Sequence, residues 1–348
     1  MMPSHHPLVE DLFSGREEGT ALSRRALAKI ITLLESTKKE HRQESDLILN
    51  QLMPFSGKSL RVGISGVPGV GKSTLIESLG LYLIQKGFRV AVLAIDPSSS
   101  ISGGSILGDK TRMEFLSVNP MAYIRPTPSS GNLGGVAEKT RETMLVCEAA
   151  GYDVVLVETV GVGQSEIAVS RMTDIFVLLQ LPNAGDDLQA IKKGVMEIAD
   201  LVVINKVDLD PDAAMRAQAH IVGSLRIFTQ HGHPDHAGLN PQTWQPQVMS
   251  LSALENKGID SLWHKITEFE TIQKSNGAFA ERRIRQAKTW LWDRIESGLA
   301  QDFKAHEQVS KVLPELQKDV EAGVIAASVA ARKILDIFKN LSPSKESR

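Results

Sequence analysis

The chain has 348 residues, enough to bury a large core in one main domain with extensions. Its 39 basic and 41 acidic side chains nearly cancel, so the charge balance argues against a broad surface for nucleic acid. Cys147 is the single cysteine, which excludes an intrachain disulfide, and no apolar run is long enough for a membrane span or a signal-peptide core. We therefore expect a cytoplasmic protein that binds neither nucleic acid nor membranes.

The N-terminal segment is predicted to be helical. Apolar side chains at a spacing of four residues indicate one helix face, and these are Leu22, Ala26, Ile30 and Leu34. A second helix is predicted over residues 47–53, ending before Pro54. Residues 1–57 are therefore interpreted as an N-terminal helical extension.

Six apolar runs predict the strands of a nucleotide-binding domain over residues 58–273. Because the runs are continuous rather than alternating, they are typical of a parallel sheet covered on both faces. The runs are residues 60–64, 90–95, 154–157, 175–181, 201–204 and 247–251. Helical stretches separate most of them, so the predicted fold class is α/β, with a doubly wound, mostly parallel sheet and the ligand at the carboxyl ends of the strands.

A phosphate-loop pattern, GxxxxGK[ST], follows the first predicted strand at residues 66–73. In this pattern backbone N–H groups surround the phosphates, Lys72 reaches the β and γ oxygens, and the Ser73 hydroxyl binds Mg2+. The predicted nucleotide-binding residues are Gly66, Pro68, Gly69, Val70, Gly71, Lys72, Ser73 and Thr74. Taken alone the pattern also fits a Gly-rich turn, but after an apolar strand it predicts a P-loop NTPase.

An NKxD pattern, which recognises guanine, follows the fifth predicted strand and comprises Asn205, Lys206 and Asp208. The Asp208 carboxylate accepts hydrogen bonds from guanine N1 and N2, whereas adenine offers neither donor, so GTP is favoured over ATP. A buried acceptor left unpaired costs about 1–3 kcal/mol. After the sixth strand, Ser252, Ala253 and Leu254 fit the backbone loop that supports the base from its other edge.

The predicted strand at residues 154–157 ends in Glu158, where a carboxylate holds Mg2+ or its water and the Gly161 N–H senses the γ-phosphate. Small signalling GTPases usually carry Asp in place of Glu158 and a water-orienting Gln directly after the glycine. Here that next residue is Val162, which cannot polarise water. We therefore predict slow intrinsic hydrolysis, with the missing group supplied by another loop or by a partner.

Longer stretches carry a specific resemblance. They are residues 66–74, 94–99 (AIDPSS), 103–113 (GGSILGDKTRM), 125–135 (RPTPSSGNLGG), 158–166 (ETVGVGQSE), 185–194 (GDDLQAIKKG) and 205–208. In these stretches the chain resembles the MeaB/ArgK family of P-loop GTPases, relatives of the methylmalonic aciduria type A protein. The resemblance implies a GTP-hydrolysing chaperone that gates adenosylcobalamin loading and protects or reactivates a B12-dependent acyl-CoA mutase, typically methylmalonyl-CoA mutase.

The resemblance also implies individual roles. Asp96 and Asp109 match acidic residues near Mg2+ in a first switch, and residues 185–193 match a third mobile loop that carries Asp186, Gln189 and Lys192. A lysine near the γ-phosphate neutralises charge that develops during phosphoryl transfer. The resulting catalytic candidates are Lys72, Asp96, Glu158, Gln189 and Lys192, and the Mg2+ candidates are Ser73, Asp96, Asp109 and Glu158. A solvated helix face is the alternative for the charged residues of this loop.

Residues 274–348 are predicted to form a charged helical arm, with a last helix over roughly residues 322–338. Its apolar stripes have no obvious sheet to cover, so a partner chain is one way to bury them. The resemblance implies a homodimer formed through this arm. Folding back onto the chain's own domain is the alternative.

Three histidines, His231, His233 and His236, suggest a metal site of the kind found in metal-insertion GTPases. The surrounding Gly and Pro residues favour an exposed loop instead. Besides the mutase chaperone, two functions stay open: a metal-insertion GTPase, and a protein kinase of an amino-acid transport system, against which Asp208 argues. The choice among acyl-CoA mutases has no readable code in the sequence.

Overall fold

The computed structural model describes residues 5–15, 20–36, 38–96, 113–128, 133–159, 164–182, 193–230 and 244–340. The chain divides into two compact units, residues 1–283 and 284–348. The first unit holds the N-terminal helices and a sheet, and the second holds C-terminal helices. The domain boundaries proposed at residues 57 and 273 stay a prediction, because a compact unit is not by itself an independently folding domain.

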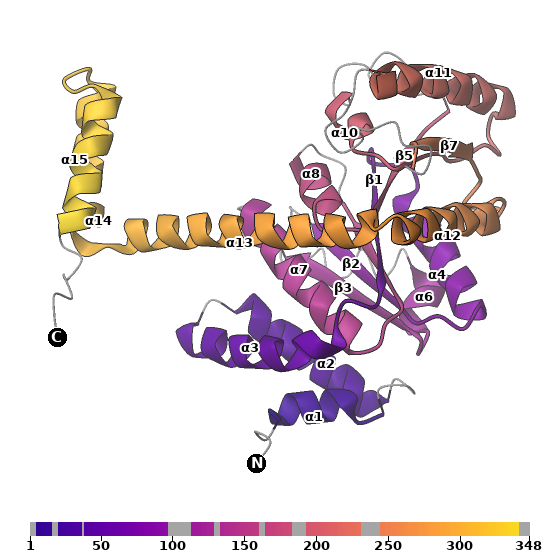
Figure 1. Ribbon diagram of the computed structural model, residues 1–348, viewed down its shortest axis with the longest axis horizontal. Coiled ribbons are helices and arrows are strands. Elements are labelled where there is room, and N and C mark those ends of the chain that lie inside the picture. The colour runs from indigo at the N-terminus through magenta and orange to yellow at the C-terminus, as the bar shows by residue number, and fades with distance from the viewer. Residues whose placement is uncertain are drawn as a thin grey trace. The chain divides into compact units, whose positions relative to one another are not determined.

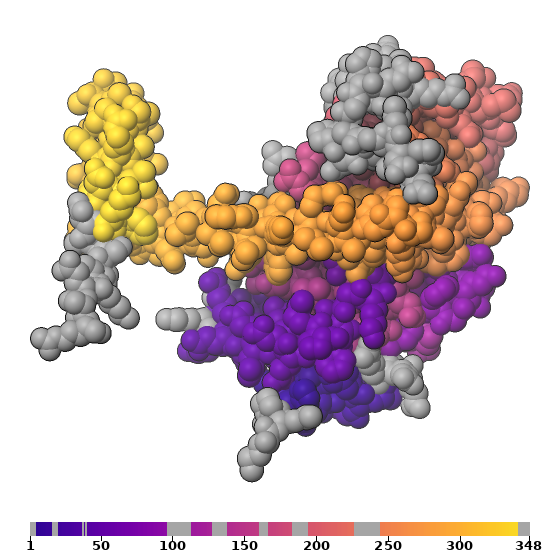
Figure 2. Space-filling view, viewed as in Figure 1, coloured from indigo at the N-terminus to yellow at the C-terminus, as the bar shows by residue number. Residues whose placement is uncertain are grey.

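The N-terminal helices pack against the sheet domain within the first unit. They are α1 (Pro7–Phe13), α2 (Ala21–Glu35), α3 (Lys39–Leu52) and the 3-10 turn η1 (Met53–Phe55). The predicted face of α2 is buried at Ala26, Ile30 and Leu34, whereas Leu22 is 46% exposed. Both α2 and α3 contact α7, and an ion pair between Glu35 and Arg125 joins the end of α2 to the sheet. Figure 2 shows the surface of these helices in indigo and purple.

In the described residues seven parallel strands form one sheet in the order β3-β2-β4-β1-β5-β6-β7. The strands are β1 (Leu60–Gly66), β2 (Val90–Asp96), β3 (Ala122–Pro128), β4 (Val154–Glu158), β5 (Ile175–Gln180), β6 (Leu201–Ile204) and β7 (Gln247–Ser250). The six predicted strands are confirmed. Strand β3 was not predicted, because Pro126 and Pro128 interrupt its apolar pattern; as an edge strand that pairs with β2 alone in the described sheet, it tolerates both prolines.

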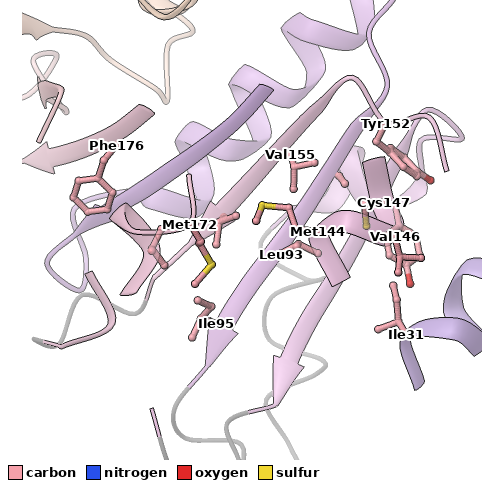
Figure 3. Close-up of a cluster of buried hydrophobic side chains, with 14 of the residues drawn as sticks. Ile31, Leu93, Ile95, Met144, Val146, Cys147, Tyr152, Val155, Met172 and Phe176 are labelled. Atoms are coloured by element: carbon pink, nitrogen blue, oxygen red, sulfur yellow. The ribbon is translucent and has the colours of Figure 1, made fainter. Parts of the chain in front are cut away.

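Helices cover both faces of the sheet, which confirms the doubly wound fold (Figure 1). One face packs on α4 (Lys72–Gln85), α6 (Glu114–Val118) and α12 (Ile259–Ser275). The other packs on α7 (Leu133–Ala149), α8 (Gln164–Ser170), α10 (Lys193–Glu197) and α11 (Pro211–Gln230). Figure 3 shows this second cluster, in which Leu93 and Val155 of the sheet lie near Met144, and Ile31 of α2 lies near Cys147.

The C-terminal helices are α13 (Ala278–Ala305), α14 (Glu307–Glu321) and α15 (Ala327–Asn340). The turn between α14 and α15 contains Gly323 at φ 71°, a left-handed conformation that suits glycine. The single helix predicted over residues 322–338 is therefore wrong at its start, since the chain turns there and the helix begins at Ala327. Phe338 of α15 packs on Phe303, with ring centroids 5.4 Å apart. Among the helices that the structure describes, none is long and apolar enough to cross a membrane.

Candidate functional site

The phosphate loop joins the carboxyl end of β1 to the N-terminus of α4, and its glycines are required by its backbone. Gly69 and Gly71 have φ of 79° and 96°, in the left-handed region that L side chains rarely adopt. A Cβ on Gly66 would lie 2.7 Å from the carbonyl oxygen of Leu179 on β5. The loop therefore packs against the neighbouring strand with no room for a side chain at its first position.

Lys72 begins α4 and is buried, and its ammonium group lies over the loop. Its Nζ donates to the carbonyl oxygens of Gly66 at 2.8 Å and Val67 at 3.2 Å. The ammonium group thus stands at the mouth of the loop, next to the N-terminal end of α4, where backbone N–H groups and the helix dipole favour an anion. This arrangement places two sources of positive potential at one point.

Asn205 connects the phosphate loop to the guanine-recognition segments. Its Nδ2 donates to the carbonyl oxygen of Val70 at 2.9 Å, and its Oδ1 accepts from the Ala253 N–H at 3.0 Å. A Cβ on Gly71 would lie 2.6 Å from Asn205 Nδ2, so glycine at this position permits the contact. The structure therefore brings the three predicted segments, residues 66–74, 205–208 and 252–254, together around one buried amide.

The segment after Asn205 turns sharply. Lys206 adopts φ 64°, which is uncommon for a residue other than glycine, and so strain is stored at this position. Asp208 follows, and its buried Oδ1 has no hydrogen-bond partner in the described residues. A buried carboxylate oxygen without a donor is the group expected where a ligand N–H is to bind.

The loop at residues 252–254 is held by two contacts that sequence reasoning did not find. Ser78 of α4 donates through Oγ to the Ala253 carbonyl at 2.8 Å, and Ser252 pairs through its backbone with Lys257 at 3.0 and 3.1 Å. The pKa of Lys257 is raised by its hydrogen bond to Glu255. In the sequence, the one hint of the Ser78 contact is that this serine lies among the apolar residues of the α4 segment. Leu254 itself is 74% exposed.

Ser73 and Glu158 are the described members of the predicted Mg2+ set. Ser73 Oγ donates to Glu158 Oε1 at 3.3 Å, so that β4 and α4 each contribute one oxygen at the carboxyl edge of the sheet. A hydroxyl and a carboxylate form the oxygen-only set that a hard cation such as Mg2+ prefers. These two residues fit the predicted metal. Asp96 ends β2, two residues past Ala94, the register partner of Glu158.

Several predicted site residues lie outside the described part of the chain. They are Asp109, Gly161, Val162, Asp186, Gln189, Lys192, His231, His233 and His236, together with the side chain of Asp96. Their roles stay predictions. Cys147, by contrast, is fully buried in α7, and burial raises the pKa of its thiol, which agrees with a packing role.

Comparison with known proteins decides the family. A model described as "Methylmalonyl Co-A mutase-associated GTPase MeaB" matches residues 27–308. The chain belongs to the MeaB family of GTPases. The MeaB-family chain is 49% identical over 328 residues to a putative GTPase of Caulobacter vibrioides, covering 94% of this chain and 98% of that one.

Two further relatives agree with the MeaB assignment. Identity is 42% over 343 residues to the mouse "Methylmalonic aciduria type A homolog, mitochondrial", covering 95% of this chain and 80% of that one. A crystal structure described as LAO/AO transport system kinase matches with a TM-score of 0.73 at 36% identity, covering 95% of this chain and 97% of that chain. The family, the P-loop fold and the GTPase activity predicted from the sequence are confirmed, and a guanine nucleotide is the ligand that this fold binds.

Proposed function

We propose that this chain is a GTP-dependent chaperone that gates adenosylcobalamin loading and protects or reactivates a B12-dependent acyl-CoA mutase. Membership of a family described as mutase-associated supports the partner class. The observation that supports a guanine nucleotide most directly is the amide of Asn205. It bonds both to the phosphate loop and to the base loop, residues 252–254, so the two predicted parts of the nucleotide site lie next to each other. Methylmalonyl-CoA mutase is the first client to test.

The residues perform the reaction as follows. The α4 N-terminus and Lys72 bind the β- and γ-phosphates, with the ammonium group exchanging its two carbonyl partners for phosphate oxygens. Asp208 accepts from guanine N1 and N2 and selects GTP. Ser73 and Glu158 would hold Mg2+, which when bound would neutralise negative charge on the phosphates. Val162 cannot orient water, so hydrolysis without a partner is slow, below about 1 per second.

The test measures GTP hydrolysis by the purified full chain alone and with methylmalonyl-CoA mutase in apo and adenosylcobalamin-loaded forms. We expect the mutase to raise the rate by at least about tenfold, because a catalytic group completed by a partner is worth up to roughly 10³–10⁵ in rate. Cobalamin transfer into the mutase should depend on the nucleotide supplied. Equal rates with and without the mutase, together with nucleotide-independent transfer, contradict the proposal.

Lys192 offers a sharper test with its neighbour as control. Lys192→Ala should lower the mutase-stimulated rate by at least about a hundredfold while leaving GTP affinity unchanged, because a charge that acts on the transition state affects kcat alone. Lys193→Ala removes the same charge one position later and should retain the stimulated rate. Equal stimulated rates for the Lys192→Ala variant and the unmodified protein remove Lys192 from the catalytic set.

The homodimer belongs to the same proposal. Exposed apolar side chains on α13, namely Leu291, Trp292 and Leu299 at 58%, 63% and 58% exposure, are available for burial against a second copy. Light scattering of the full chain should give twice the monomer mass, and Leu291→Glu should return it to the monomer. A monomeric unmodified chain contradicts this part. Nickel or zinc binding that is lost on replacing His231, His233 and His236 would favour the metal-insertion alternative instead.

A further inference from the structure

A row of polar side chains lies inside the sheet, beneath the nucleotide site. Thr159 directly follows β4, Ser65 belongs to β1 and Gln180 is the last residue of β5. These three strands are neighbours in the order β4-β1-β5. The three side chains are 1%, 0% and 0% exposed, so none of them reaches water.

Gln180 lies on the face of the sheet that packs on α7, α8, α10 and α11. Side chains alternate along a strand, and Phe176 and Leu178 of β5 belong to the buried cluster on that face. Ile204, the register partner of Gln180 on β6, belongs to the same cluster. Figure 3 shows Phe176 within this apolar layer. The side chain of Gln180 therefore lies on the face of the sheet that carries this apolar layer.

Only part of this polar row has hydrogen-bond partners among the described residues. Thr159 Oγ1 donates to Ser65 Oγ at 2.8 Å. Both Nε2 and Oε1 of Gln180 lack a hydrogen-bond partner in the part of the chain that the structure describes. Buried polar groups in folded proteins are nearly always paired, since burial without a partner costs free energy that an apolar residue of similar size avoids. A methionine would fill this position at lower cost, so the amide has a use elsewhere in the working cycle.

The position of Gln180 indicates that use. Its backbone carbonyl accepts from the Asn205 N–H at 2.9 Å, which ties it to the residue that joins the base loop to the phosphate loop. On its other side, the preceding Leu179 pairs with Gly66 and presents the carbonyl oxygen that closes the first position of the phosphate loop. Gln180 thus lies between the two halves of the nucleotide site, and neither the donor nor the acceptor of its amide has a partner in the described part of the chain.

We propose that Gln180 is a positioning residue that couples nucleotide binding to the alignment of β1, β5 and β6. In the free protein its amide has no hydrogen-bond partner among the described residues, and in the GTP-bound protein it gains hydrogen-bond partners at the carboxyl edge of the sheet. A ligand shifts a conformational equilibrium only through such a difference in interactions between states. This inference rests on GTP binding but adds a regulatory residue that does not touch the nucleotide.

The test replaces Gln180 with methionine and compares thermal unfolding and nucleotide affinity in the full chain. The free Gln180→Met protein should unfold about 2–4 °C higher than the unmodified one, because it no longer buries an unpaired amide. Its affinity for a non-hydrolysable GTP analogue with Mg2+ should fall by about tenfold, because the bound state has lost the amide's new partners. Higher stability with lower affinity is a combination that a purely structural residue does not produce.

Thr143→Val is the matched control. Thr143 is fully buried in α7 and its Oγ1 also has no hydrogen-bond partner among the described residues. Its replacement should raise the unfolding temperature of the free protein and leave the affinity for the analogue unchanged. The control separates the general effect of removing an unpaired hydroxyl from an effect specific to the site.

Two outcomes overturn the inference. One is a Gln180→Met protein that binds the analogue as tightly as the unmodified chain. The other outcome can be observed even if the Gln180→Met variant misfolds, because it needs only the unmodified protein. It is a crystal structure with the bound analogue in which no donor and no acceptor lies within about 3.2 Å of the Gln180 amide. If the unmodified chain binds no GTP, the proposed function fails as well. If it binds GTP and Gln180→Met is neutral, this inference alone fails.

Discussion

The two edges of the sheet differ in how their polar groups are used. At the amino edge, an aspartate lies directly before each of three strands. Its carboxylate accepts a hydrogen bond from a backbone N–H at or next to the start of a neighbouring strand. Asp153 accepts from Arg89 at 2.7 Å, Asp174 from Arg61 at 2.8 Å and Asp200 from Phe176 at 2.8 Å. At the carboxyl edge, Asp208 Oδ1 and the Gln180 amide have no partner in the described residues. One edge is closed by its own side chains, and the other keeps polar groups for a ligand.

Arginines at the start of α13 complete the amino edge. Arg282 donates to Asp200 at 3.0 and 3.1 Å, and Arg283 donates to Asp174 at 2.6 and 2.7 Å. Arg61 forms a further buried ion pair with Glu148 at 2.6 Å. Because Glu148, Asp174 and Asp200 each pair with an arginine, we expect mutations at this edge to change stability, and mutations at the opposite edge to change ligand binding.

The largest expected effect is at the carboxyl edge. Asp208→Ala would remove the two charge-assisted hydrogen bonds that we propose Asp208 accepts from guanine. Each is worth about 1.5–3 kcal/mol, so GTP affinity measured by calorimetry should fall at least about a hundredfold. Asp210→Ala is the control, since Asp210 caps α11 through the Ala213 N–H at 2.8 Å. It should lower stability by about 1 kcal/mol with GTP affinity retained. Equal affinity losses in the two variants contradict the division between edges.

Next in size is the amino edge. Arg283→Ala leaves the Asp174 carboxylate buried without its counter-ion and also removes donors to the Gly57 and Ser59 carbonyls. We expect the free energy of unfolding in urea to fall by about 3 kcal/mol, while GTP affinity stays within about twofold. Lys288→Ala, at an exposed position of α13, should change neither quantity. A parallel loss of GTP affinity in Arg283→Ala would show that this edge also serves the ligand.

The smallest expected effect is that of GTP on the reactivity of Cys147. This residue directly precedes Glu148 near the C-terminal end of α7. Its thiol is fully buried and burial raises its pKa, so little thiolate forms at pH 8. Ellman's reagent should therefore react roughly a hundredfold more slowly with the native protein than with the protein in urea. The rate should not change when GTP is added. Faster reaction on adding GTP would mean that the amino edge opens with the ligand.

The sequence predicted the elements better than their contacts. Continuous apolar runs predicted six strands because strands buried on both faces need apolar residues throughout. The edge strand β3 was not predicted because prolines interrupt its apolar pattern. Helix α14 was not predicted either, and the predicted C-terminal helix began too early, in the turn that contains Gly323. The order of the strands in the sheet was not predicted either, since loop sequences do not encode which strands become neighbours.

The candidate site shows the same limit. The spacing of the motifs predicted a guanine nucleotide as the ligand, and the individual residues assigned to it stay a prediction. The hydrogen bonds of Asn205 to the phosphate loop and to Ala253, and that of Ser78 to Ala253, depend on the order of the strands and on the close approach of two loops. They could therefore be found only in the three-dimensional structure. In the sequence, Gln180 lies within the apolar run at residues 175–181. Its significance lies in the absence of partners around it in the described residues, which a one-dimensional pattern does not record.

Calorimetric titration of the purified full chain with GTP and with ATP, each with Mg2+, tests the account most directly. We expect one GTP to bind per chain, with a preference over ATP of at least about a hundredfold, because the Asp208 carboxylate and the phosphate loop would bind the same GTP molecule. Absence of GTP binding, or equal affinity for ATP, would contradict the assignment of the carboxyl edge as a guanine-nucleotide site.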